Sequence, residues 1–143
     1  MSQYYPPFRA LVPVPRKPSN PIERAFAKYN GAFTVSMHAI EQMWERVPGL
    51  NSQIELPLLR TGSHVMGQWL AKRVLAGSVT KVKHLAQTTY DVLGPESEAV
   101  YRVVEAADSL LLITVLDRPK NETRGEDPNI FRGLVDDLQK EVA

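Results

Sequence analysis

Three histidines, His38, His64 and His84, are the side chains in this chain that exchange protons near neutral pH. His38 follows Ser36, a residue type that caps helices, so we expect it near a helix N-terminus. The helix dipole there favours a neutral imidazole, which is the form that acts as a base. The structural alternative for His38 is a histidine bonded to backbone or to a carboxylate, and for His84 a place at the edge of the core.

Several kinds of catalytic site are excluded by what the sequence lacks. The chain has no cysteine, which excludes disulfides, thiolate zinc sites and cysteine nucleophiles. It also has no glycine-rich phosphate loop, no His-Glu-x-x-His and no Gly-x-Ser-x-Gly motif. Its carboxylates do not cluster with metal-binding spacing. We therefore expect neither a metal nor a cofactor.

Charge is distributed unevenly along the chain. Residues 56–90 contain no Asp or Glu, whereas acidic residues outnumber basic ones from Asp91 onward. A basic stretch beside an acidic one favours a surface that attracts phosphate, and hence binding of nucleic acid such as RNA. The alternative is that these charges disperse on folding and are simply solvated. The candidate nucleic-acid-binding residues are Arg60, Lys72, Arg73, Lys81 and Lys83.

The composition is that of one globular domain. The chain has 143 residues, of which 43% are hydrophobic and 23% charged, which is enough for one hydrophobic core without disulfides or structural metals. Neither a signal peptide nor an apolar run long enough to span a bilayer is present, so we expect a cytoplasmic protein without membrane contact. The sequence leaves the oligomeric state open.

Apolar periodicity predicts the elements that must position these side chains. Helices are expected over 21–30, capped by Asn20, over 37–47, capped by Ser36, and irregularly over 58–76, with 50–57 as a link. Strands are expected over 32–35, 79–90, 99–106 and 110–116, the last one central and buried on both faces. A closing helix is expected from about Asn129. The fold class is therefore α+β, with a three-stranded antiparallel meander and helices on one face.

Residues 1–21 form a separate proline-rich arm before a single domain over 22–143. Six prolines in this arm exclude a helix or a central strand and favour an extended chain. Its apolar residues distinguish it from a plain linker, so it packs on its own domain or docks on a partner protein. The candidate partner-binding residues are Tyr4, Tyr5, Phe8 and Leu11.

The order of elements resembles the RelE/BrnT-like group of small toxins, within the metal-independent ribonuclease toxin superfamily, as a phage or mobile-element member. The similarity covers roughly residues 32–118. It depends on the segment FTVSMHA at 33–39, on Glu45-Arg46, and on YRVV at 101–104 followed by LITVL at 112–116. Gln42 stands where such a motif has its first arginine.

The resemblance implies RNA binding or RNA cleavage. Metal-free cleavage needs a base for the 2′-hydroxyl, an acid for the leaving oxygen and cations beside the phosphate. The resemblance gives the catalytic roles to His38, Arg46 and Arg102, whereas Arg46 as a helix-to-sheet tether is the structural alternative. Gln42, the apolar arm and the acidic tail favour two other functions, a non-catalytic accessory protein that inhibits a host protein or a subunit of an assembly. Whether the domain is an enzyme stays open at this point.

Overall fold

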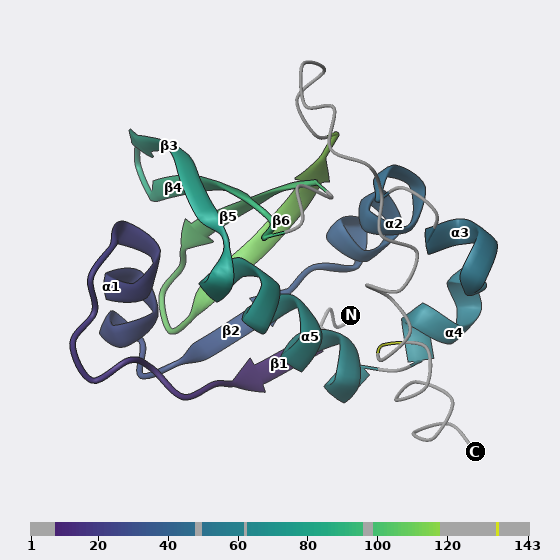
Figure 1. Ribbon diagram of the computed structural model, residues 1–143, viewed down its shortest axis with the longest axis horizontal. Coiled ribbons are helices and arrows are strands. Elements are labelled where there is room, and N and C mark those ends of the chain that lie inside the picture. The colour runs from purple at the N-terminus through teal and green to yellow at the C-terminus, as the bar shows by residue number, and fades with distance from the viewer. Residues whose placement is uncertain (1–7, 48–49, 62, 96–98, 118–133, 135–143) are drawn as a thin grey trace.

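The computed structural model describes residues 8–47, 50–61, 63–95, 99–117 and 134. Eleven elements follow one another along these residues (Figure 1). In chain order they are β1 (Phe8–Leu11), α1 (Pro21–Lys28), β2 (Ala32–Val35), α2 (Met37–Arg46), α3 (Leu50–Gln53), α4 (Leu56–Thr61), α5 (Ser63–Ala76), β3 (Ser78–His84), β4 (Thr88–Leu93), β5 (Val100–Glu105) and β6 (Leu110–Leu116).

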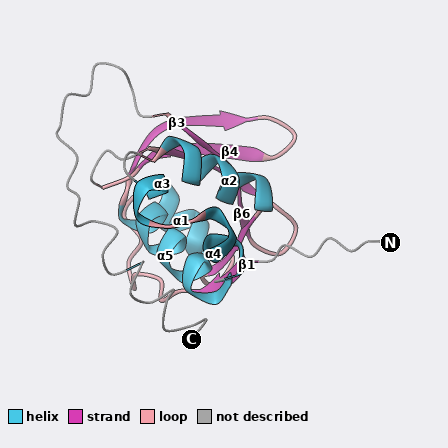
Figure 2. Cartoon of the chain, turned by 90° about the vertical axis from the view of Figure 1, so that its right-hand side faces the viewer, coloured by secondary structure: helices cyan, strands magenta, loops and turns pink. Residues whose placement is uncertain are grey.

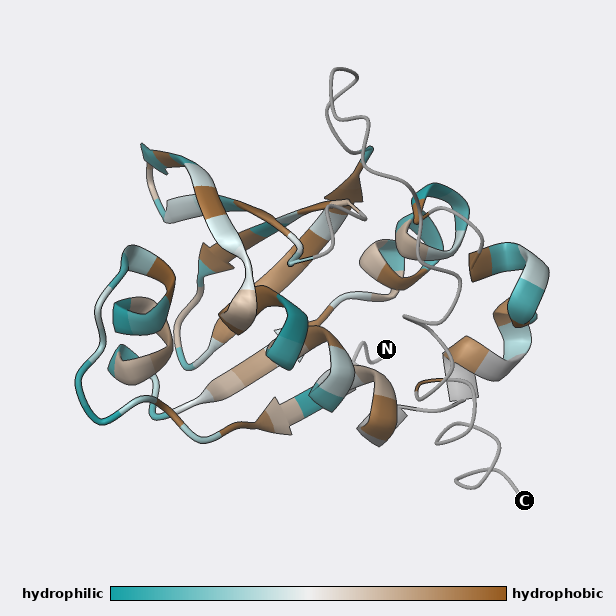
Figure 3. Cartoon of the chain, in the orientation of Figure 1, coloured by the Kyte–Doolittle hydropathy of each residue, from teal (hydrophilic) through white to brown (hydrophobic). Residues whose placement is uncertain are grey.

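All six strands belong to one sheet, in the order β1-β2-β6-β5-β4-β3. Every neighbouring pair is antiparallel except β2 and β6, which run parallel. The predicted α+β class and the antiparallel meander are confirmed, and β6 holds the predicted central position. It is the most continuously hydrophobic strand in Figure 3, although its side chains alternate between buried and half-buried.

The meander has four strands and not three, which corrects the prediction of one strand over 79–90. The chain reverses at 85–87 and forms the β3–β4 hairpin. The alternating pattern continues through this turn because Leu85-Ala86-Gln87 carries no Gly, Pro or Asn to mark it. Leu85 is consequently 68% exposed at the hairpin tip.

The predicted caps are confirmed at α1 and α2. The Asn20 side chain accepts from the Glu23 N–H at 2.8 Å, and the Ser36 hydroxyl accepts from the Ala39 N–H at 3.1 Å. The link over 50–57 is more structured than predicted, since it contains α3 and the start of α4. The predicted helix from Asn129 lies outside the described residues apart from Leu134, whose side chain is buried.

Part of the predicted arm belongs to the sheet. Residues 8–11 form the edge strand β1 and pair with β2, and Ala10 and Val12 are buried. Gly31 holds this contact close, because its φ of 83° and its approach to the Val12 carbonyl leave no room for a Cβ, which would lie 2.1 Å from that oxygen. From residue 8 onward, the arm therefore packs on its own domain.

The helices fill the space that the sheet leaves open. α5 packs against β1 and β2, α1 contacts α5, and α2 lies along β6. Figure 2 shows the helices gathered between the β3–β4 hairpin and β1. One continuous core joins these layers, and its largest fully buried side chains are Tyr101, Phe26 and Phe33. Phe26 of α1 stacks on Phe33 of β2 with ring centroids 5.6 Å apart.

Candidate functional site: the groove between α1 and β3

His38 and Arg46 lie at opposite ends of α2. His38 is its second residue and is exposed, and Arg46 is its last. With a rise of about 1.5 Å per residue, the two are separated by about 12 Å along the helix axis. Arg46 donates to the Val115 carbonyl at 2.9 Å and Ser36 to the Ile113 carbonyl at 3.3 Å, at an edge of β6 that β2 leaves unpaired. Arg46 is therefore placed as a helix-to-sheet tether.

Arg102, the third predicted catalytic residue, forms a two-pronged pair with Asp91. Its Nε lies 2.8 Å from Asp91 Oδ1 and its Nη2 lies 3.1 Å from Oδ2, across the β4–β5 register that pairs these two residues. The hydrogen bonds that Arg102 donates to Asp91 raise the pKa of Arg102, so the charge is permanent but is already matched. His38 thus lies at the far end of α2 from Arg46, and both guanidinium groups are bonded to protein acceptors.

The predicted nucleic-acid-binding residues divide between α5 and β3. On α5, Lys72 is exposed and the Arg73 guanidinium lies 5.4 Å from the centre of the Trp69 ring. On β3, Lys81 and Lys83 are exposed. The backbone of Arg60 belongs to α4, and its side chain lies outside the described part of the chain.

Two adjoining hollows form a groove between α1 and β3, with volumes of about 430 and 470 Å³. They share Pro21 and Val82, so they lie next to each other along the strand. We call the first the deep hollow and the pair the α1–β3 groove. From α1 the deep hollow is lined by Pro21, Arg24, Ala25 and Lys28. From the sheet it is lined by Val82, His84, Tyr90 and Glu105.

A β-bulge lies beside the second hollow, whose lining at the sheet edge includes Lys81; the register pairs Lys81 with Asp91, so its side chain lies on the face of the sheet opposite that of Val82 and Tyr90. Val79 and Lys81 pair with the consecutive residues Val92 and Asp91, so Thr80 is an extra residue in β3. Bulges redirect side chains at sheet edges. Of the described residues that line the two hollows, Glu105 is the one acid.

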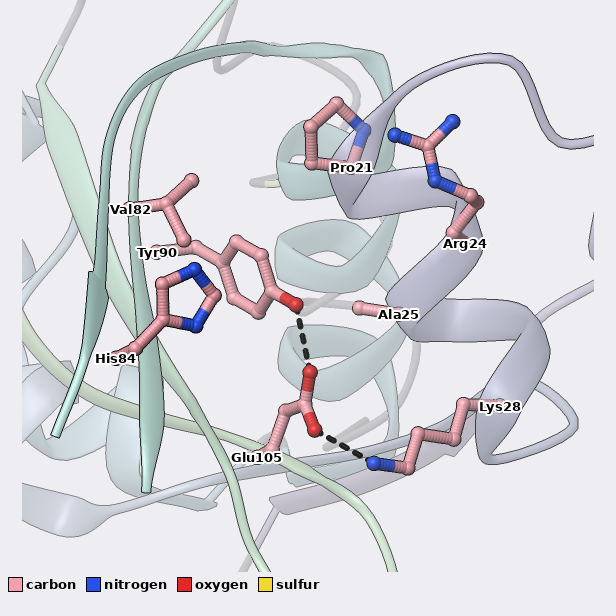
Figure 4. Close-up of a pocket in the computed structure, with 8 residues that line it drawn as sticks. All are labelled: Pro21, Arg24, Ala25, Lys28, Val82, His84, Tyr90 and Glu105. Carbon is pink, nitrogen blue, oxygen red and sulfur yellow. Dashed lines mark hydrogen bonds and ion pairs between the residues drawn. The ribbon is translucent and has the colours of Figure 1, made fainter. Parts of the chain in front are cut away.

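Three residues of the deep hollow are joined by hydrogen bonds (Figure 4). Tyr90 donates its hydroxyl proton to Glu105 Oε2 at 2.6 Å, and Lys28 Nζ donates to Glu105 Oε1 at 2.8 Å. The Glu105 side chain is only 15% exposed, whereas that of Lys28 is 62% exposed. The carboxylate thus connects α1 to β4 and β5 from a recessed position.

The protonation states of this cluster follow from the same contacts. Burial acts to raise the pKa of Glu105, but hydrogen bonds from Lys28 and Tyr90 outweigh it and hold that pKa below its usual value. Burial, assisted by the bond to Glu105, strongly raises the pKa of Tyr90. The bond to Glu105 also raises the pKa of Lys28. At neutral pH the cluster is an ionised carboxylate between a neutral phenol and an ammonium.

Arg24 and His84 complete the rim of the deep hollow, and both are exposed. Arg24 lies at the Pro21 end and Lys28 at the Glu105 end, with the His84 ring across from them beside Tyr90 (Figure 4). Arg24 has no acidic partner among the described residues. Its charge is thus available to an anion in a way that the Lys28 charge is not.

The predicted partner-binding residues concern the opposite edge of the sheet. Leu11 of β1 is 70% exposed, and a hollow of about 430 Å³ beside it is lined by Arg9, Ala10, Leu11, Ala32 and Gln68. Phe8 contributes its backbone to β1, and Tyr4 and Tyr5 lie outside the described residues.

Two findings in the described ranges concern metal ions and membranes. Nowhere in them do three His, Asp or Glu side chains gather closely enough to hold a metal ion. None of the helices in these ranges combines the length and the apolar character needed to cross a membrane.

Comparison with known proteins finds no matching family model, no matching curated protein and no matching solved structure.

Sequence reasoning missed Arg24, Lys28, Tyr90 and Glu105. Arg24 and Lys28 are four residues apart in a predicted helix, which places them on one face, and this spacing is a usable signal. No comparable signal links Tyr90 to Glu105, because their proximity depends on the β4–β5 register. His84 was expected at the edge of the core, and it lies on the rim of the deep hollow.

Proposed function

We propose that this domain binds RNA through the α1–β3 groove. The observation that carries the proposal is the charge along the groove: Arg24 has no acidic partner among the described residues, Lys81 lies at its edge, and Lys28 pairs with Glu105, the one acid among the described lining residues. Cations along a concave surface attract a phosphate backbone, and this attraction dominates the affinity of most nucleic-acid complexes. The absence of acids from residues 56–90 supports the same conclusion from the sequence.

The edge position of β3 supports an alternative role for its lysines. Lysines on an edge strand prevent pairing with other sheets, so Lys81 and Lys83 serve the fold even without a ligand. That protective role does not account for Arg24, which belongs to α1 and has no acidic partner within the described chain. Substitution of Arg24 therefore distinguishes a role of the groove in RNA binding from simple protection of the sheet edge.

The positions and bonding partners of His38, Arg46 and Arg102 favour a role in RNA binding over one in RNA cleavage for this domain. Two of these three residues have their guanidinium groups on Val115 O and Asp91, and His38 lies at the far end of α2 from Arg46. The RelE-like ribonuclease assignment stays a prediction. It requires cleavage of RNA that disappears in His38→Ala, whereas the groove proposal requires binding that survives this change.

The proposal is tested by titrating a short fluorescent single-stranded RNA with the protein at several salt concentrations. We expect binding at low salt and a linear fall of the logarithm of the binding constant with the logarithm of salt. Lys81→Ala should weaken binding and reduce this slope by about 0.7, the value for one phosphate contact on a single strand. Absence of binding at low salt contradicts the proposal.

The edge strand β1 supports a second candidate function, binding of a partner protein. Its edge is covered by α5, because Gln68 Nε2 donates to the Leu11 carbonyl at 3.3 Å and Gly67 lies against the Arg9 backbone, so a partner would contact the Leu11 side chain, which is 70% exposed, and the hollow beside it. Leu11→Lys should abolish partner capture while leaving thermal stability nearly unchanged, because the side chain is exposed.

A further inference from the structure

We propose that the deep hollow holds one unpaired nucleotide of the bound RNA strand, with its base on the apolar floor and its phosphate beside Arg24. This inference rests on the proposed RNA binding and names the part of the RNA that the hollow selects. The inference depends on the shape and polarity of the hollow. The charge of the groove would attract phosphate even without a hollow of this shape.

The apolar side chains that line the deep hollow form what we call its floor. Most of its accessible apolar surface belongs to the half-buried Pro21 and Val82, because Ala25 and Tyr90 are only 3% and 7% exposed. The volume of about 430 Å³ is within the range of small-ligand pockets. Bases of single-stranded nucleic acids pack on such apolar and aromatic surfaces, independently of their identity, since every base has a π-face.

The two ends of the hollow differ in charge, and this difference orients the nucleotide. At one end the Lys28 charge is matched by Glu105 at 2.8 Å, and the carboxylate repels phosphate. At the other end Arg24 has no acidic partner among the described residues (Figure 4). A phosphate is therefore favoured at the Arg24 end, where a guanidinium binds it with two parallel hydrogen bonds.

Glu105 has the capacity to receive the rest of the nucleotide. An ionised carboxylate offers about four acceptor positions, and the bonds from Tyr90 and Lys28 use one on each oxygen. The remaining positions accept a hydrogen bond from a base N–H or a ribose hydroxyl. A nucleotide has an anion at one end and such donors at the other, which matches the polarity of the hollow.

The base must be unpaired to reach the floor. In a duplex its faces are covered by stacking and its Watson–Crick edge by pairing, so neither face is free to pack on an apolar surface. A duplex would contact the rim of the groove through Arg24 and Lys81 and leave the floor empty. We therefore expect single-stranded RNA to bind more tightly than the same sequence in duplex form.

The test uses Val82→Phe, which fills the floor without changing charge and suits an edge strand. We expect this variant to bind single-stranded RNA about tenfold more weakly or worse, the cost of losing one packed base, and to bind duplex as the wild type does. Ile113→Phe on β6 is the matched control, half-buried and outside the groove, and should bind both like the wild type. Circular dichroism confirms that each variant is folded.

Calorimetry with adenosine 5′-monophosphate, adenosine and inorganic phosphate identifies the recognised unit. We expect the monophosphate to bind more tightly than either fragment, and Val82→Phe to abolish its binding. If wild-type protein binds RNA but Val82→Phe matches it on single strands, the nucleotide inference is wrong and RNA binding stands. If duplex binds as well as single strand, the inference is equally wrong. Failure of every RNA to bind at low salt instead overturns the proposed function.

Discussion

Tyr90 on β4 and Glu105 on β5 share a hydrogen bond of 2.6 Å at the floor of the deep hollow. The same carboxylate receives Lys28 from α1 at 2.8 Å, so one buried anion connects the helix to the sheet. Because Tyr29, the C-cap residue of α1, also donates to the Ala106 carbonyl at 2.7 Å, α1 is held at two points beside β5. The groove between α1 and β3 is therefore a fixed feature of the fold.

Glu105→Gln should separate stability from RNA binding. Loss of the charge weakens the bonds from Tyr90 and Lys28, so we expect the free energy of unfolding to fall by about 1 to 3 kcal/mol. Affinity for duplex RNA at low salt should rise, because the groove loses its one described acid and a duplex makes no bond to Glu105. Tyr90→Phe is the control, with a smaller loss of stability and unchanged charge. A Glu105→Gln variant that binds duplex RNA more weakly contradicts the assigned geometry.

The Glu105 carboxylate should also make stability depend on pH in the acid range. Its pKa is lowered in the folded state, so its contribution to stability is complete above the unfolded-state value of about 4.3 and is lost as the pH falls through the folded-state pKa. Melting temperatures of the wild type and Glu105→Gln should therefore differ at pH 7 and converge below about pH 4. A constant difference over this range contradicts the assignment.

His38 and Arg46 should behave differently in stability and alike in RNA binding. Arg46→Met leaves the Val115 carbonyl without its donor, so we expect a loss of about 1 to 2 kcal/mol in unfolding free energy. His38→Ala changes an exposed side chain and should stay within about 0.5 kcal/mol. Neither variant should change RNA affinity in the low-salt titration. A large loss of RNA binding or of RNA cleavage in His38→Ala would favour the RelE-like mechanism instead.

Gly31→Ala should loosen the arm from the domain. The new Cβ would lie 2.1 Å from the Val12 carbonyl oxygen in a left-handed backbone conformation, so we expect a loss of more than about 1 kcal/mol. The bond from the Val12 N–H to Gly31 O, 3.1 Å long, should break with it. Hydrogen exchange at Val12 measures this directly. Unchanged protection of that amide contradicts the close approach.

Much of the fold could be predicted where the signal is local. Asn20 and Ser36 mark helix starts through the chemistry of a single side chain, and a continuous apolar run identifies β6. The β3–β4 turn could not be predicted, because 85–87 contains no residue type that favours a turn. The strand β1 was not predicted, because prolines flank it in the sequence, although the edge strand of a sheet tolerates prolines.

The site was less predictable than the fold for a physical reason. Arg46 and Arg102 look like free cations in the sequence, and only the packing of α2 on β6 and the β4–β5 register provide their acceptors. The same register places Glu105 beside Tyr90. Charge content could be read from the sequence, whereas the pairing of charges depends on contacts between residues distant along the chain.

The most direct test of the account compares Arg24→Glu with Arg9→Glu in RNA binding at low salt. Both replace an exposed arginine, but Arg24 lines the α1–β3 groove whereas Arg9 lies on β1 at the opposite edge of the sheet. We expect Arg24→Glu to weaken binding of single-stranded RNA about tenfold or more and Arg9→Glu to retain most of the wild-type affinity. Equal losses in the two variants, or a greater loss in Arg9→Glu, would contradict RNA binding in the groove.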